Sequence, residues 1–406
     1  MESLIKDSVI FYLRTIEFFS IACLLFVLPF SGLTTIKEIL FFLLLISFAA
    51  ERLAGYKEVN RISLPDKFLL LFIIASFVWA LIALITAIDL SYSLNEILTK
   101  MSRQFLLFFL SFFIVKEIPI EKVRWLFFTV LASAALMSVY ACYQFYQSPL
   151  FFINRVHGFT GAFYRLSTLL VLAIPLAVTA FLLRDFLKRF IFISLFVPLV
   201  FAALFFTFTR SAWIAVVAEI SLLTIIFLGK KGRFLFISGL AILLVIIGLS
   251  YKSVIPQQLL SRGSEEPRIE AVKLSFEIIR KYPLTGIGYG KETFSKHYPD
   301  TYVKHAHNIF LNTAVETGLV GLALLAAILG IVLKNFLFAI RHEKTPEKRL
   351  LLSGIFASFI GFLFLNLFDY MYHGWPGQMF WMIIGIGFAL IRTSTQNDLK
   401  SRPLYS

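Results

Sequence analysis

Two histidines precede a long apolar segment, in the sequence Lys304-His305-Ala306-His307-Asn308. Histidine is the side chain whose ordinary pKa suits proton transfer near neutral pH, so either histidine is a candidate general base. Spacing alone does not choose between His305 and His307. The alternative is an interfacial histidine at a membrane surface.

Polar residues continue into the apolar segment that begins at His307. Asn312 and Glu316 follow Asn308 at intervals of four residues, which places all three on one helical face. Such a face inside a membrane usually lines a bundle interior or a cavity, and the alternative is a polar seam between helices. Gly318 and Gly321 would let a neighbouring helix approach closely.

Two arginines are candidates for binding an anion. Arg210 lies where two apolar segments meet, beside the hydroxyl groups of Thr209 and Ser211, and a snorkelling interfacial arginine is the alternative. Arg268 lies in the first turn of a predicted helix, on its apolar face. A guanidinium beside free backbone N–H groups suits a phosphate. Together with a histidine, the two arginines suit a diphosphate leaving group and a hydroxyl nucleophile.

Other candidates for substrate contact are weaker. Arg155 and His157 lie in a segment with two glycines that also reads as a turn, and Asp369 would alternatively pair with an arginine. The sequence contains no glycine-rich nucleotide loop, no metal-ligand cluster and no Ser-His-Asp arrangement. We therefore expect chemistry without a metal or another cofactor.

The elements that position these residues are predicted to be membrane helices. Of the 406 residues, 59% are hydrophobic and only 15% are charged, whereas soluble domains carry roughly 25% charged residues. The net charge of +14 is spread over many short loops, so we attribute it to membrane topology and expect no nucleic-acid partner. Cys23 and Cys142 lie in apolar runs, which predicts no disulfide.

Twelve apolar segments are long enough to suggest membrane helices. They span residues 14–32, 35–50, 67–88, 102–115, 123–146, 166–183, 190–208, 211–228, 233–251, 307–335, 350–372 and 376–392. This predicts an all-α integral membrane protein with nine helices in residues 1–251, an outer loop in 252–306, three helices in 307–392 and a tail in 393–406. Lys and Arg are concentrated on the side of the N-terminus, which predicts cytoplasmic termini and an outward-facing loop.

The predicted loop has structure of its own. Glu266-Pro267 is a helix-start signal, and the helix is expected to end before Pro283. On a helical wheel, an apolar stripe lies beside a charged face. The stripe consists of Ile269, Val272, Phe276 and Ile279. Three glycines between Gly286 and Gly290 then predict a turn whose backbone approaches another element closely.

Three motifs, in this order, resemble the O-antigen ligase/polymerase family. They are Phe206-Thr207-Phe208-Thr209-Arg210-Ser211-Ala212-Trp213, then Arg268 with Pro283-Leu284-Thr285-Gly286-Ile287-Gly288, then His307-Asn308 with Leu311, Glu316, Gly318 and Gly321. The resemblance is densest over residues 195–330. It implies a GT-C-like glycosyltransferase architecture with about twelve transmembrane helices and one large periplasmic loop containing a short amphipathic helix.

The resemblance also implies a reaction. A glycan would move from undecaprenyl diphosphate to an acceptor hydroxyl at the periplasmic face of the bacterial inner membrane, without metal or nucleotide and with inversion. For a ligase the acceptor is a lipid A–core sugar, in lipopolysaccharide biosynthesis. His307 would be the base, because His305 lacks the following Asn, and Arg210 and Arg268 would bind the diphosphate. Surrounding membrane lipids are the remaining partners.

Two alternatives remain. A polymerase of the same family would use a second lipid-linked glycan as its acceptor, although the single large loop favours a ligase. A polyprenyl-linked or polar-solute transporter would show inverted repeats and sites at mid-membrane, and the sequence shows no repeat between its halves. After Arg268 this sequence has Ile269-Glu270-Ala271, where many members of the family carry a Trp nearby. This departure from the family pattern bears on the acceptor subsite.

Overall fold

A computed structural model describes residues 2–54, 64–147, 155–182, 186–239, 266–301 and 303–400. Helices are the only regular elements in these ranges, in agreement with the predicted fold class. The α-helices are α1 (Glu2–Val27), α2 (Thr34–Ala54), α3 (Lys67–Ile82), α4 (Leu90–Glu96), α5 (Ser102–Val115), α6 (Ile120–Gln147), α7 (Phe163–Leu182), α8 (Phe186–Phe206), α9 (Arg210–Phe227), α12 (Glu266–Lys281), α13 (Thr293–His297), α14 (Ile309–His342), α15 (Pro346–Asn366) and α16 (Trp375–Lys400).

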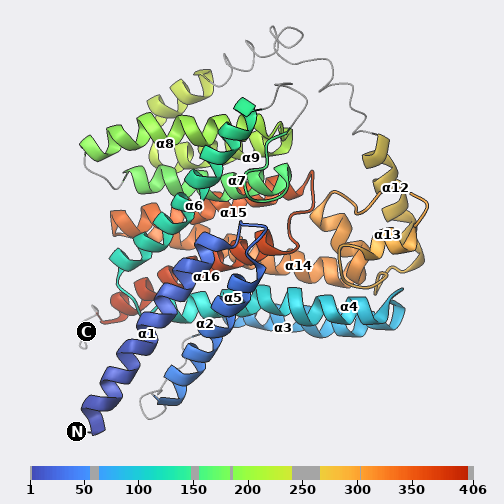
Figure 1. The fold of residues 1–406 in the computed structure, drawn as a ribbon, viewed down its shortest axis with the longest axis horizontal. Coiled ribbons are helices and arrows are strands. Elements are labelled where there is room, and N and C mark those ends of the chain that lie inside the picture. The colour runs from blue at the N-terminus through green and yellow to red at the C-terminus, as the bar shows by residue number, and fades with distance from the viewer. Residues whose placement is uncertain are drawn as a thin grey trace.

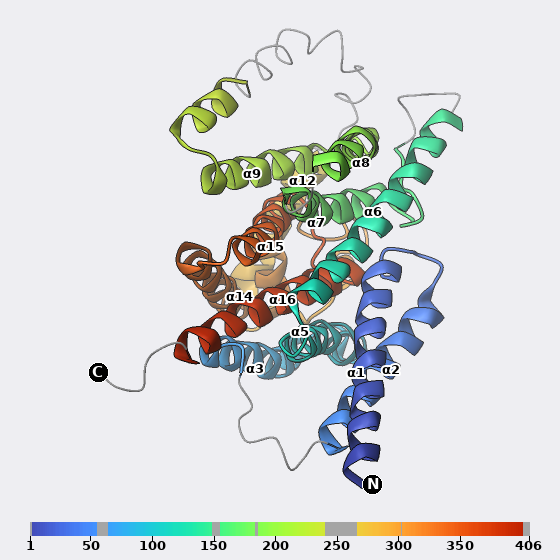
Figure 2. The same ribbon diagram turned by 90° about the vertical axis from the view of Figure 1, so that its left-hand side faces the viewer.

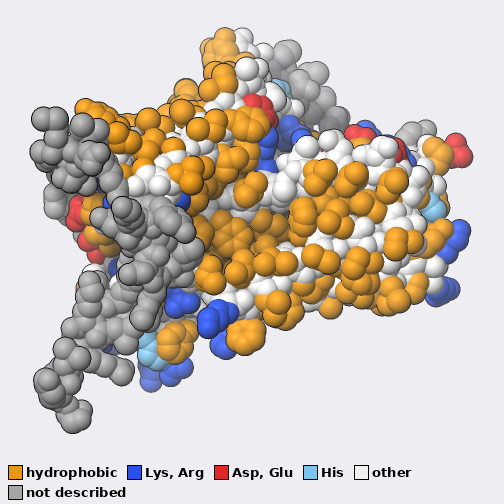
Figure 3. Space-filling model, turned by 90° about the horizontal axis from the view of Figure 1, so that it is seen from below, with side chains coloured by type: hydrophobic (Ala, Val, Ile, Leu, Met, Phe, Trp, Pro, Cys, Tyr) orange, Lys and Arg blue, Asp and Glu red, His pale blue; other side chains and the backbone are white. Residues whose placement is uncertain are grey.

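The chain is a multi-pass membrane protein. Eight stretches of the described residues are helical, long and apolar enough to cross a bilayer, and hydrophobic side chains are spread widely over the described part of the face seen in Figure 3. Helices overlap eleven of the twelve predicted segments over most of their length, and residues 233–239 of the twelfth are helical as well. The remaining segment, 233–251, lies mostly outside the described residues, so twelve crossings stay a prediction.

The bundle is built around α15. This helix packs between α7 and α9, while α14 packs on α3, and α16 packs on α5 (Figures 1 and 2). Small residues allow the close approaches: a Cβ at Gly354 would collide with Thr179 of α7, and one at Gly361 would collide with Glu219 of α9. α12 and α13 lie at the right of Figure 1, opposite the start of α1 and the end of α16.

Helix α14 is broken at Gly318, where the backbone has φ 71° and ψ −175°. Residues 283–290, here called the glycine segment, cross the helix at this break. The N–H groups of Ile287 and Gly288 donate to the carbonyls of Val315 and Glu316 at 2.9 and 3.1 Å. The N–H of Leu319 donates to the carbonyl of Pro283 at 2.7 Å. The crossing segment therefore satisfies backbone groups that the broken helix leaves unpaired.

The crossing requires glycine on both partners. A Cβ at Gly318 would collide with the backbone of Leu284, and one at Gly286 would collide with the backbone of Val315 and Glu316. The predicted close approach at Gly286 is thus confirmed. The expectation that Gly318 admits a neighbouring helix is wrong, because the element that reaches it is a loop segment.

α12 has the predicted length but a different buried face. Its buried residues are Ala271, Ser275 and Ile278, and the helix packs on α14. The small side chains of Ala271 and Ser275 permit this approach. Most of the predicted apolar stripe is exposed, namely Ile269, Val272 and Phe276.

We predict that Gly318→Ala destabilises the protein by about 3 kcal/mol or more, because the new methyl group meets the backbone of Leu284 at a positive φ. Gly330→Ala, in the same helix, is the matched control. No atom lies within 4 Å of its Cβ position, so a gain of up to about 1 kcal/mol is expected. Thermal unfolding of both variants in detergent measures this, and equal melting temperatures would contradict the description of the crossing.

Candidate active site

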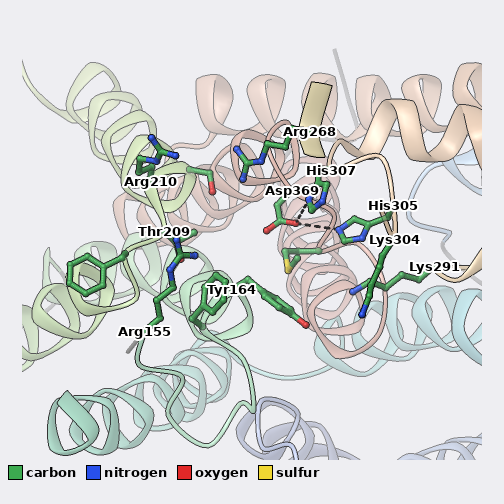
Figure 4. Close-up of a pocket in the computed structure, with 14 residues that line it drawn as sticks. Arg155, Tyr164, Thr209, Arg210, Arg268, Lys291, Lys304, His305, His307 and Asp369 are labelled. Carbon is green, nitrogen blue, oxygen red and sulfur yellow. Dashed lines mark ion pairs between the residues drawn. The ribbon is translucent and has the colours of Figure 1, made fainter. Parts of the chain in front are cut away.

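A cavity of about 480 Å³ lies where α9, α12 and the segments before α7, α14 and α16 meet (Figure 4). This volume lies within the range of about 300–1,000 Å³ that is usual for small-molecule sites. The cavity is lined by Arg155, Phe163, Tyr164, Phe208, Thr209, Arg210, Ser211, Arg268, Lys291, Lys304, His305, His307, Asp369 and Met371. Residues far apart in the sequence thus surround one space.

Three ionisable side chains form a cluster in the middle of this cavity. Nε2 of His305 and Nδ1 of His307 each lie 3.6 Å from Oδ1 of Asp369, and the two imidazole rings are 4.1 Å apart. The side chain of His305 is 10% exposed, whereas that of His307 is 30% exposed. His307 is therefore the histidine that a substrate reaches more easily.

The backbone holds His307 in an unusual conformation. Its φ is +51°, which is uncommon for a residue other than glycine. The next residue, Asn308, caps α14: its Oδ1 accepts from the N–H groups of Phe310 and Leu311, and its Nδ2 donates to the carbonyl of Leu367 at 2.9 Å. The cap fixes where the helix begins and so fixes His307 just outside it.

Burial and charge set the protonation of the cluster. Burial alone would raise the pKa of Asp369, but its contacts with His305 and His307 outweigh burial and hold the pKa well below its usual range. Burial lowers the pKa of His305. At neutral pH we therefore expect an ionised Asp369 beside a neutral His305.

Positively charged side chains surround this cluster. Arg210 is the first residue of α9, and Arg268 lies in the first turn of α12. The guanidinium carbon of Arg155 lies 4.4 Å from the centre of the Phe163 ring. All three arginines line the cavity, as does Asp369, so the structure brings together four of the sequence candidates with the two histidines.

Three other candidates lie outside the lining. Glu316 is buried behind the cavity, where it accepts hydrogen bonds from Asn312 Nδ2 at 2.7 Å and Tyr370 Oη at 3.2 Å. Asn312 in turn accepts from the N–H of Ala306, so this polar face supports the segment that carries the histidines. Asn308 acts as the helix cap, and His157 lies against Gln144. Their roles as substrate contacts stay predictions.

Sequence reasoning gave no role to Lys291 or Lys304, although both line the cavity. Lys304 adjoins His305, which was a usable signal. Lys291 directly follows the glycine segment, and its position depends on the crossing at α14, which no local pattern reveals.

The cluster of two imidazoles and one carboxylate is also a ligand set that a divalent ion accepts. The ligand atoms of His305, His307 and Asp369 lie within 4.8 Å of one another. Metal-independent chemistry therefore stays a prediction, to be tested with a chelator.

Residues 195–326 match the O-antigen ligase (Wzy_C) family model. This family covers both ligases and polymerases, which transfer lipid-linked glycans. The O-antigen ligase match includes Arg210, Arg268 and His307, covers about a third of the 406 residues and ends before Asp369. A comparison with curated proteins finds no match.

We predict that Asp369→Asn lowers the thermal stability at pH 7, and that the difference from wild type narrows as the pH falls below about 4, the ordinary value for Asp. The sign follows from the lowered pKa of Asp369 in the folded state. The ionised Asp369 stabilises the folded protein fully when the pH is above the pKa of this carboxyl in the unfolded chain. This stabilisation is lost as the pH falls toward and through the pKa of the same carboxyl in the folded protein. Melting temperatures across this range measure the effect, and a constant difference would contradict the assigned charge state.

Proposed function

We propose that the protein transfers a glycan from undecaprenyl diphosphate to a hydroxyl of an acceptor, at the periplasmic face of a bacterial inner membrane. The observation that carries this proposal is that several arginines, a partly accessible histidine and the carboxylate that contacts it line one cavity. The match of residues 195–326 to the O-antigen ligase family supports it. Both termini would lie in the cytoplasm.

In the proposed reaction, His307 acts as the general base. Its Nδ1 is turned toward Asp369, which leaves Nε2 for the acceptor hydroxyl. The hydroxyl gives its proton to Nε2 while its oxygen forms a bond to the anomeric carbon of the sugar. Asp369 stabilises the imidazolium that results, and the attack from the far side inverts the anomeric carbon.

Arg210 and Arg268 would bind the diphosphate. As the bond between the anomeric carbon and the phosphate oxygen breaks, its electron pair stays with the diphosphate, where negative charge grows. Guanidinium groups placed in advance around this position stabilise the charge without reorganisation. Arg155 lies on the same side of the cavity and would add to this field (Figure 4).

The acceptor defines which enzyme this is. We favour a ligase that uses lipid A–core oligosaccharide, as the single large outer loop suggests. A polymerase that extends lipid-linked repeats would use the same base and the same diphosphate site, and the family match accommodates both. The candidate residues gather at one end of the bundle, which does not favour a transporter with a site at mid-membrane.

We predict that His307→Ala lowers the rate of glycan transfer by about 10²–10⁴-fold, the usual contribution of a general base, while binding of the lipid-linked donor is largely kept. His297→Ala is the matched control, because His297 lies in α13 on the same side of the protein, where it packs against Tyr298. Transfer assays with purified variants measure both rates. Wild-type turnover in His307→Ala would end the assignment.

We predict that Arg268→Lys fails to restore the activity lost in Arg268→Ala, because a lysine ammonium cannot form the paired hydrogen bonds of a guanidinium to phosphate. Arg280→Lys, on an exposed part of the same helix, should retain activity. Steady-state kinetics with varied donor measures the effect. Full activity in Arg268→Lys would reduce the role of Arg268 to a general electrostatic one.

A further inference from the structure

The charges that line the cavity do not balance. Among its described lining residues, five are Lys or Arg and one is a carboxylate. That carboxylate, Asp369, already contacts His305 and His307. This excess of positive charge would attract anionic ligands into the cavity.

The positive charges fall into two groups on different sides of the histidines. Figure 4 shows Arg155 and Arg210 on one side of the cavity and Lys291 and Lys304 on the other, with His307 and Asp369 between them. Arg268 lies near His307, toward the arginine side. The two lysines thus form a separate basic group, here called the lysine pair.

Neither lysine of the pair forms an ion pair within 4 Å with a carboxylate of the described residues, although Asp369 and Glu292 lie close enough to Lys291 to interact with it electrostatically. Lys291 is half-buried, and its Nζ lies 5.6 Å from the centre of the Tyr164 ring. Burial lowers the pKa of Lys291. In contrast, the nearby Lys296 pairs with Asp89 at 2.6 Å. These carboxylates offset the burial of the Lys291 ammonium only in part, and a bound anion would offset the remaining cost.

The backbone places Lys291 firmly. Gly290, which precedes it, has φ +133° and packs so tightly on Tyr92 of α4 that a Cβ would collide with the ring. The N–H of Thr293 donates to the carbonyl of Gly290 at 3.1 Å. Lys304 is exposed, but its backbone directly precedes the buried His305. Both ammonium groups therefore come from anchored backbone, as a specific subsite requires.

The chemistry of the proposed transfer assigns the two basic groups to different substrates. In an inverting displacement, the attacking hydroxyl and the leaving diphosphate lie on opposite faces of the anomeric carbon. The diphosphate of the donor bears one charge on each phosphorus atom, which the arginines suffice to bind. The lysine pair lies beyond the proposed base, on the side from which the acceptor hydroxyl must come.

We propose that Lys291 and Lys304 form a second anion subsite, which binds a phosphate or carboxylate group of the acceptor close to its attacking hydroxyl. This inference rests on the proposed function and adds to it a property of the acceptor. The enzyme selects acceptors that are anionic near the site of transfer.

The test compares acceptors with and without that charge. The probes are rough lipopolysaccharide, the same material after removal of its phosphates, and the same material after amidation of its carboxylates. We expect wild type to show a KM at least about 10-fold lower for the charged acceptor that fits, as one charge-assisted contact provides. Which treatment removes the preference identifies phosphate or carboxylate as the group bound.

The double variant Lys291→Gln/Lys304→Gln should lose this preference, so that its KM for the charged acceptor rises about 10-fold, to the value for the neutral acceptor. Lys281→Gln, at the end of α12 and outside the cavity lining, is the matched control and should behave as wild type. An unchanged acceptor KM in the double variant would overturn the subsite. A raised donor KM alone would also overturn it, because the lysines would then belong to the donor site.

Direct binding separates this inference from the proposed function. Binding of the three acceptor probes to wild type and to the double variant is measured without donor. Weaker binding of the charged probe to the double variant supports the subsite, even if wild type transfers no glycan and the proposed function falls. Equal binding of that probe to both proteins would overturn the subsite, even if transfer is observed.

Discussion

The crossing of the glycine segment over the break in α14 is the constraint on which the site depends. A helix broken inside a membrane leaves backbone groups that cost several kcal/mol each if they stay unpaired. Here Ile287, Gly288 and Leu319 take part in the hydrogen bonds that pair them. The outer segments are thereby attached to the bundle at one register, since a shift of the glycine segment would bring a larger residue to the place of Gly286, against the backbone of Val315 and Glu316.

The crossing also explains how distant residues reach one cavity. Lys291 leaves the glycine segment directly, and the buried pair of Asn312 and Glu316 holds the backbone of Ala306 between the two histidines. α15 then ends beside Asn308, whose side chain binds the carbonyl of Leu367, and this brings Asp369 to the histidines. The cluster of His305, His307 and Asp369 is thus positioned from α14 and α15 together.

Much of this arrangement follows from sequence, and the reasons for the rest are physical. Apolar runs predict the helices because a segment that crosses a bilayer has to be apolar and to pair its backbone groups internally. The resemblance selects Arg210, Arg268 and His307, which the structure brings to one cavity. The polar face through Glu316 is correctly expected to face inward, but it supports the histidine segment from behind. The role of the lysine pair depends on the path of the chain across α14, which hydrophobic periodicity does not encode. The same holds for the exposed stripe of α12, because the face that packs is decided by the small residues Ala271 and Ser275.

The most direct test of the central claim is product analysis after incubation of the purified wild-type protein with undecaprenyl diphosphate-linked glycan and rough lipopolysaccharide, in EDTA and without nucleotide. The account predicts glycan attached to the lipid A–core and release of undecaprenyl diphosphate. Longer glycan on the lipid carrier would instead identify a polymerase that uses the same site. Absence of both products, with donor shown to be bound, would contradict the claim that this cavity transfers glycans.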